Sequence, residues 1–194
     1  HIMNKTILVP AFILMVIAQW YIPGSMIYQS EKVLTDGTVY KFKTAPVDPN
    51  DPFRGKYITL YFNANTVVVD SAYEWSMGDQ AYAILETDSA GFARIQGLSK
   101  VEIKGQDNYI KVDVDYVQID SITTVFVRYP FDRFYMEETK APLAEQAYNE
   151  AARDTNQVAY ALVMVRTGEA MVKDVIIDDL PITEWIKKNH PNQE

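Results

Sequence analysis

The sequence predicts a mainly β protein: a single antiparallel β-sandwich or barrel-like domain with one short helix, preceded by an N-terminal apolar helix. Apolar and polar residues alternate with a period of two over most of the chain. No charged residue occurs between Lys5 and Glu31, and helical spacing recurs in one later segment. We divide the 194 residues into an apolar segment (1–28), a connector (29–38) and a β-rich domain (39–194).

The charge-free segment is long enough to cross a membrane. As a helix, Ile7–Ile27 would measure about 31 Å at ~1.5 Å per residue, close to the ~30 Å hydrocarbon core of a bilayer. Trp20, Tyr21 and Tyr28 stand where an interfacial aromatic belt would lie. We therefore expect a single-pass anchor over residues 6–27. A cleaved signal peptide and a buried helix of a soluble protein are the alternatives.

Prolines and flanking charge refine the expectation for this segment. Pro10 and the proline-glycine pair at 23–24 predict a regular helix over Thr6–Ile22 only, followed by a polar connector with a turn at the sequence TDG. Lys5 and the terminal amine make the N-terminal flank the more positive one. This charge favours an N-terminus inside the cell and a domain outside.

The clearest strand is YIKVDVDY, Tyr109–Tyr116, in which apolar residues alternate with Lys and Asp. Such alternation is typical of an antiparallel strand with one buried and one wet face. The turn sequences TDSAG and RTGE predict hairpins over Gln80–Gly97 and Val158–Ile177. Strands are expected at Thr38–Thr44, Tyr57–Phe62, Asn65–Asp70, Gln80–Glu86, Phe92–Gly97, Ile122–Tyr129, Val158–Arg166 and Ala170–Ile177.

One segment of the domain has helical rather than strand character. The sequence APLAEQAYNEAARD contains good helix formers, with Pro142 at a plausible first helical position. Leu143, Ala147 and Ala151 are four residues apart, so they would share one face of a helix. We expect this helix to be an insertion in the β-domain.

Composition removes several kinds of chemistry. The chain has no cysteine, which excludes thiol nucleophiles, disulfides and Cys-ligated metals. Of its two histidines, His1 precedes Met3 like part of a cloning remnant and His190 lies in a polar tail, so we expect neither a Ser-His-Asp triad nor a histidine metal site. The net charge of −8 argues against a nucleic-acid partner, which would require a Lys/Arg footprint. We expect no cofactor and no metal.

The stretch VDPNDPFRGKYITLYF, Val47–Phe62, could form either a binding surface or a stiff loop leading into a strand. Its two prolines, Pro49 and Pro52, together with Pro46 just before it, fix φ and keep the preceding residues extended. Alternation gives the strand an aliphatic face, expected to be buried, and a tyrosine-bearing face. Ile58, Leu60 and Phe62 belong to the first face, and Tyr57, Thr59 and Tyr61 to the second.

This stretch resembles the signature of the bacterial GDYXXLXY family. Gly55, Tyr57 and Leu60 occupy named positions of the motif. Lys56 stands in place of the motif's Asp, and Phe62 in place of its last Tyr. The exchange at position 56 inverts a charge, which speaks against metal binding or acid–base work at that position.

A second stretch, RYPFDRFYMEE at Arg128–Glu138, is similar to another segment of the same family, which lies before a short helix. The resemblance implies a small membrane-anchored protein with an accessory or partner role, often encoded beside multi-spanning membrane proteins. It implies no particular reaction, because the family has no established activity.

We expect the two stretches to converge on one polar surface, with Arg54 or Arg133 within hydrogen-bond reach of a carboxylate of the other stretch. In the alternative, the aromatic rings pack beneath a loop and the ions form exposed pairs worth only ~0–1 kcal/mol each. The candidate binding surface comprises Asp48, Asp51, Arg54, Tyr57, Tyr61, Arg128, Asp132, Arg133, Tyr135 and Glu137.

Together these features predict a membrane-anchored, non-enzymatic, extracytoplasmic β-domain that acts as an accessory or interaction protein, with a multi-spanning membrane protein as the expected partner. The expected location is the inner (cytoplasmic) membrane; if the apolar segment is cleaved, the domain would be secreted to the periplasm. A module that binds an envelope glycan or small ligand is the alternative. A carboxylate-based hydrolase ranks below both.

Overall fold

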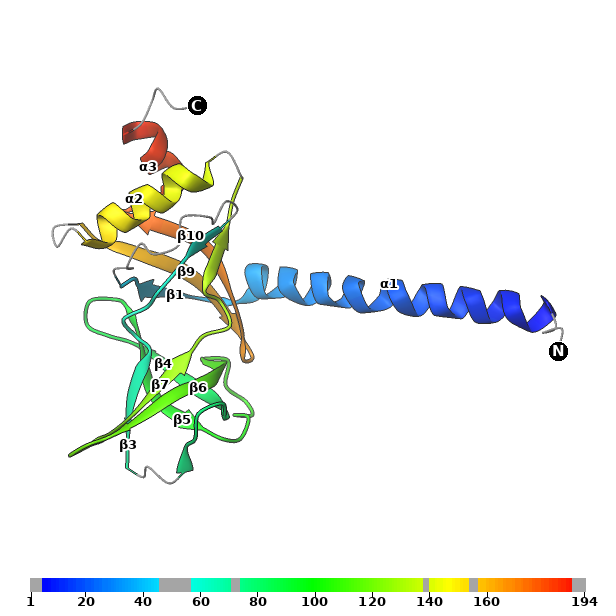
Figure 1. The fold of residues 1–194 in the computed structure, drawn as a ribbon, viewed down its shortest axis with the longest axis horizontal. Helices are drawn as coiled ribbons and strands as arrows, with labels where there is room; N and C mark the ends of the chain where they lie inside the picture. Colours follow the sequence, from blue (N-terminus) through cyan, green and yellow to red (C-terminus); the bar gives the residue numbers. More distant parts are fainter. Residues whose placement is uncertain (1–4, 46–56, 71–73, 138–139, 154–156, 190–194) are drawn as a thin grey trace.

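The computed structural model shows a long N-terminal helix joined to a domain of antiparallel strands, so the mainly β fold class is confirmed (Figure 1). The structure describes residues 5–45, 57–70, 74–137, 140–153 and 157–189. The helices are α1 (Lys5–Asp36), α2 (Ala141–Arg153) and α3 (Ile182–Asn189). The strands are β1 (Thr38–Lys43), β2 (Tyr57–Thr59), β3 (Thr66–Val69), β4 (Gln80–Thr87), β5 (Ala93–Ser99), β6 (Tyr109–Ile119), β7 (Thr123–Arg128), β8 (Arg133–Tyr135), β9 (Ala159–Arg166), β10 (Glu169–Ile177) and β11 (Leu180–Pro181).

The strands form two larger sheets and one small one. The four-stranded sheet has the order β1-β9-β10-β11 and carries α2 and α3 at its side (Figure 1). The five-stranded sheet has the order β3-β7-β6-β4-β5. Its outer strands β3 and β5 come close to each other, so this sheet curls into a nearly closed barrel. A two-stranded sheet, β2-β8, is formed by the segments that connect the larger sheets. β2 links β1 to β3, and β8 links β7 to β9 by way of α2.

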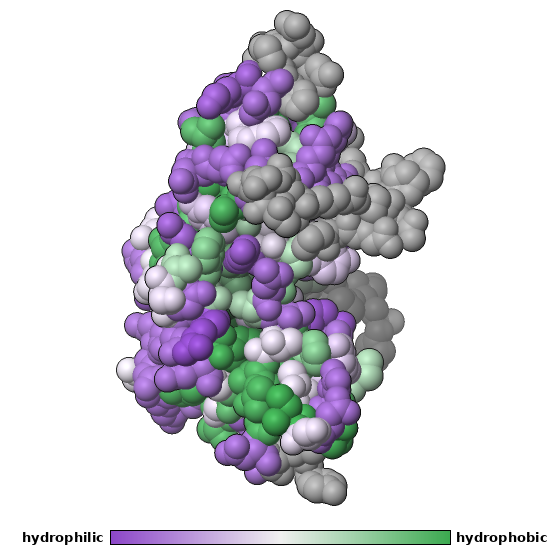
Figure 2. Space-filling view, turned by 90° about the vertical axis from the view of Figure 1, so that its left-hand side faces the viewer, coloured by the Kyte–Doolittle hydropathy of each residue, from purple (hydrophilic) through white to green (hydrophobic). Residues whose placement is uncertain are grey.

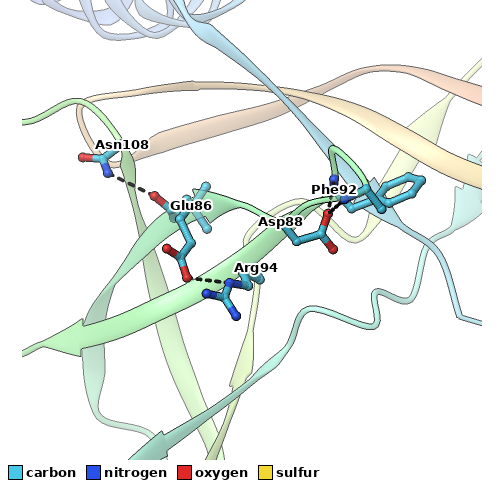
Figure 3. Close-up of polar contacts among 7 residues, drawn as sticks. Glu86, Asp88, Phe92, Arg94 and Asn108 are labelled. Atoms are coloured by element: carbon cyan, nitrogen blue, oxygen red, sulfur yellow. Dashed lines mark hydrogen bonds and ion pairs between the residues drawn. The ribbon is translucent and has the colours of Figure 1, made fainter.

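The two predicted hairpins are present. β4 pairs with β5 around the TDSAG turn, where the carboxylate of Asp88 accepts hydrogen bonds from the N–H groups of Ala90 and Phe92, both at 2.9 Å (Figure 3). β9 pairs with β10 around RTGE, where Thr167 and Gly168 both have positive φ, as a two-residue hairpin turn requires. Turn chemistry that is visible in the sequence therefore sets the register of both hairpins.

The elements β8 and α3 of the domain were not expected from the sequence. β8 lies in a stretch expected to be a loop, because three residues carry too little alternation to predict a strand before the partner is known. The helix α3 follows the turn at Asp178 and Asp179 and buries Ile182 and Ile186, which are four residues apart. That spacing was a usable signal, but the helix has only 8 residues.

The helix α1 extends well beyond the predicted Thr6–Ile22 and includes most of the predicted connector 29–38. It continues through Pro23 to Asp36, since proline removes one hydrogen bond without ending the helix. Most of its apolar side chains are exposed, and Val9–Asp36 is long and apolar enough to cross a membrane. Figure 1 shows α1 projecting away from the domain, with its N-terminus far from the strands.

The exposed apolar surface of α1 contrasts with the mixed surface of the domain. On the face shown in Figure 2, polar side chains dominate the upper part, whereas apolar side chains gather on the lower part. Exposed apolar side chains of the five-stranded sheet and its hairpin include Val68, Ile119 and Ile122. On this face the exposed apolar side chains are therefore gathered on one part of the domain and are not spread evenly over it.

The last turn of α1 is packed against the four-stranded sheet. Val33 is buried, and α1 contacts β9 and β10. The N–H of Gly37 donates to the carbonyl oxygen of Val33 over 3.1 Å. A Cβ atom at Gly37 would overlap with that oxygen and would lie 3.1 Å from the carbonyl oxygen of Val165. The passage from helix to strand thus leaves room for glycine alone.

Replacing Gly37 with alanine should therefore weaken the junction between helix and sheet by about 1–3 kcal/mol, the usual cost of overpacking. Limited proteolysis of the full chain in a bilayer mimetic should show faster cleavage near residue 37. Gly24→Ala is the matched control, because nothing lies within 4 Å of a Cβ at Gly24. Equal cleavage rates for the two variants would contradict the packing described for Gly37.

An aromatic cluster joins the sheets inside the domain. Phe42 of β1 meets the rings of Phe62, Tyr129 and Phe131 at centroid distances of 5.5, 5.2 and 5.3 Å. All four side chains are buried. The hydroxyl of Tyr129 donates to the carbonyl oxygen of Ala64, and burial raises the pKa of Tyr129. This cluster holds together β1, the end of the first stretch at Phe62 and the start of the second stretch at Tyr129 and Phe131.

Candidate functional site

The two stretches singled out in the sequence lie side by side as an antiparallel pair. β2 belongs to the first stretch and β8 to the second, and Tyr57 stands opposite Tyr135 while Thr59 stands opposite Arg133. Directly opposed side chains in a strand pair point to the same face. Tyr57, Thr59, Arg133 and Tyr135 therefore share one face of the two-stranded sheet.

The side chains on this face touch one another, and we call Tyr57, Arg133 and Tyr135 the tyrosine–arginine face. The guanidinium of Arg133 lies 4.8 Å from the ring centroid of Tyr57, and the rings of Tyr57 and Tyr135 are 5.6 Å apart. Tyr135 is 66% exposed. A side-chain hydrogen bond with Tyr135, aided by the Asp132 carboxylate, raises the pKa of Arg133. The face is a preformed aromatic and cationic surface open to solvent.

The opposite face of the first stretch is buried, as predicted. Ile58, Leu60 and Phe62 are all buried in the core. The backbone of this stretch also forms hydrogen bonds with segments on both of its sides. The N–H of Leu60 donates to the carbonyl oxygen of Asp132 over 2.8 Å, and the carbonyl oxygen of Tyr61 accepts the N–H of Ala45 over 2.8 Å. Leu60 and Phe62 thus serve packing, while Tyr57 remains available at the surface.

A first groove, of about 260 Å³, lies beside this strand. Three predicted site residues line it: Tyr61, Arg128 and Asp132. The guanidinium of Arg128 lies 3.6 Å from a carboxylate oxygen of Asp115 and 4.0 Å from one of Asp113. The sequence suggested only a wet strand face for these two aspartates. Their meeting with Arg128 depends on the register of β6 against β7, which the sequence did not reveal.

A second groove, of about 540 Å³, lies between the β8 region and β10. Arg133 and Tyr135 line it on one side, and residues 170–173 line it on the other. Asp132 lines both grooves, and its carboxylate lies 3.6 Å from the Nε atom of Arg133. Five of the predicted residues are therefore distributed over two neighbouring grooves that share Asp132.

The remaining predicted residues are placed elsewhere or lie outside the described residues. Glu137 lies before α2, where its carboxylate pairs with Nζ of Lys140 at 2.6 Å and its carbonyl oxygen accepts the N–H of Ala141. Glu137 therefore helps to begin the helix. Asp48, Asp51 and Arg54 lie outside the described residues, so the expected contact between Arg54 and the second stretch stays a prediction.

Metal-ligating side chains do not gather in the described part of the chain. Within the described ranges, no group of three or more His, Cys, Asp or Glu side chains could hold a metal ion. The features that stand out are the exposed rings of Tyr61 and Tyr135, an arginine over the half-buried ring of Tyr57, and two polar grooves. Such an arrangement is suited to binding.

Fold and site together define a β-rich domain that follows an N-terminal apolar helix and presents a preformed tyrosine–arginine face. A family model, GDYXXLXY protein, matches residues 19–175, and the chain belongs to this family. The resemblance inferred from the two stretches is thereby confirmed. Comparisons with curated proteins and with solved structures gave no match. The family description names a sequence motif and no reaction.

Proposed function

We propose that this protein is a membrane-anchored, non-enzymatic accessory protein whose extracytoplasmic domain binds a membrane protein through the tyrosine–arginine face. The observation that carries this proposal is the contact among Tyr57, Arg133 and Tyr135 on a partly exposed strand pair. Tyr and Arg are enriched in protein interfaces and dominate their energetic hot spots.

The rigidity of this face supports a binding role. The strand pairing of β2 with β8 holds the backbone, and the rings restrain Arg133 before any partner arrives. Less side-chain entropy is then lost on association, where ordering one long side chain costs about 0.5–1.5 kcal/mol. A partner that presents a carboxylate would meet a fork of donors already in place.

The helix α1 supports the membrane assignment and the type of partner. Its exposed apolar side chains need a nonaqueous environment, and the domain covers only its last turn. A lysine before the apolar segment favours an N-terminus inside. Confinement of both molecules to one membrane raises their effective concentration, so a modest interface suffices. A multi-spanning protein of the inner membrane is accordingly the proposed partner.

Arg133→Ala should reduce partner recovery more than tenfold, because removal of a hot-spot side chain costs at least ~2 kcal/mol in binding free energy. The measurement is extraction of the full-length protein from its native membrane in mild detergent, followed by quantitative mass spectrometry. Arg94→Ala is the matched control, since Arg94 is another exposed arginine, paired at 2.5 Å with Glu86 on the β4–β5 hairpin (Figure 3).

The expected result is an integral membrane protein recovered with wild type and with Arg94→Ala but reduced more than tenfold with Arg133→Ala. Equal recovery with all three proteins would refute the role of the tyrosine–arginine face. Failure of wild type to retain any membrane protein would refute the accessory function itself.

A further inference from the structure

The first groove has walls that backbone hydrogen bonds hold in place. The N–H of Val127 donates to the carbonyl oxygen of Asn65 over 2.8 Å, which ties β7 to the segment before β3. The backbone hydrogen bond from Leu60 to Asp132 ties the segment after β2 to the segment before β8. The buried ring of Tyr129 lies in the lining and anchors it to the aromatic cluster. The groove is therefore preformed, which is usual for small-ligand sites.

The lining combines one exposed ring with several kinds of polar group. Tyr61 is 50% exposed, which leaves its ring available for stacking. Thr59, Asn65 and Arg128 add a hydroxyl, an amide and a guanidinium, and carboxylates also line the groove. A sugar ring presents an apolar C–H face and a rim of hydroxyls that both donate and accept. Stacking with surrounding hydrogen bonds matches both parts of such a ligand.

Charge and size narrow the class of ligand. Asp115 and Asp132 outnumber Arg128 in the lining, and Arg128 is already paired with Asp113 and Asp115. An anion would meet an excess of negative charge, and a cation would lie beside the guanidinium, so a neutral ligand is favoured. The volume of about 260 Å³ is just below the ~300–1,000 Å³ of typical ligand pockets, which suits a single ring with its neighbours in solvent.

We propose that the first groove binds one neutral sugar ring of a glycan, with its C–H face on Tyr61 and its hydroxyls on the Asp115–Arg128 pair and Asn65. This site adjoins the tyrosine–arginine face at Thr59 and Asp132, but sugar binding there does not depend on the partner proposed above. Its ligand class is set by the groove's own side chains.

Saturation-transfer NMR and calorimetry on the full-length chain would test the groove, with glucose, galactose, N-acetylglucosamine and maltose as probes. The protein must be held in a detergent or nanodisc without sugar headgroups, because an alkyl maltoside would occupy the site. We expect saturable binding of at least one probe, with the strongest saturation on one C–H face. Tyr61→Ala should weaken binding about tenfold, whereas Tyr61→Phe, which keeps the ring, should bind within about threefold of wild type.

Tyr82→Ala is the control, because Tyr82 packs on Tyr109 of β6, away from the residues that line the groove. It should bind like wild type. Absence of binding by wild type to every probe would overturn the proposal, and so would equal affinity of Tyr61→Ala and wild type. Cleavage of maltose during the titration would also overturn it, since the groove would then be the active site of a hydrolase.

Discussion

Phe42→Ala is expected to lower the free energy of unfolding of the β-domain by about 3–5 kcal/mol, the range for truncating a buried phenylalanine. The side chain of Phe42 is 0% exposed and lies within 5.5 Å, centroid to centroid, of three other buried rings. Its loss leaves a cavity between β1 of the four-stranded sheet and the segment that carries Phe62. Domains of this size have total stabilities of only ~5–15 kcal/mol, so the effect should be large.

Urea unfolding of the full chain in a bilayer mimetic, followed by near-ultraviolet circular dichroism, measures this loss. Phe126→Ala is the control, because Phe126 stacks on the exposed ring of Tyr116 outside the buried cluster. It should cost roughly 0.5–1.5 kcal/mol for the aromatic pair. If Phe42→Ala unfolds within 1 kcal/mol of Phe126→Ala, the aromatic cluster does not join the sheets as described.

The double variant Leu14→Arg/Ile17→Arg should release the protein from membranes. Each arginine near the centre of a spanning helix costs ~2.5–3.5 kcal/mol for insertion, so the pair costs about 5–7 kcal/mol. Both side chains are exposed on α1, at 72% and 61%, and the domain fold does not depend on them. Alkaline extraction of membranes should find the wild type in the pellet and the double variant in the supernatant.

Met77→Arg/Val101→Arg is the matched control, since it adds the same charge at two exposed apolar positions of the domain. This control should stay in the pellet. A double variant of α1 that remains in the pellet would contradict the spanning helix. The intact mass of the wild type decides between anchor and signal peptide, because cleavage would remove the segment before about residue 24.

The parts of the fold that the sequence predicted are those governed by local chemistry. Alternation marked β6, and Asp88 and the Thr167–Gly168 pair marked the hairpin turns. The sequence did not predict β8, because that strand exists through its pairing with β2, far away in the chain. It also underestimated α1, whose last turn is stabilised by burial of Val33 against the sheet rather than by its own hydropathy.

The candidate site shows the same division between local and long-range information. Alternation along one strand predicted that Tyr57 and Tyr61 face away from the core. Contact of Tyr57 with Arg133, and of Arg128 with Asp115, depends on register between strands that the sequence does not specify. Residue types alone therefore selected the candidate residues, but they could not show that these residues line two different grooves.

Because α1 passes directly into β1, the length of the helix sets the distance between the bilayer and the domain. Its 32 residues measure about 48 Å at ~1.5 Å per residue, of which a bilayer core takes ~30 Å. On the proposed anchoring, about 18 Å of stiff helix remains outside the core. The domain then cannot swing as it would on a flexible tether. Its tyrosine–arginine face is then held at one distance from the membrane, so only partners with a matching epitope at that distance can bind it.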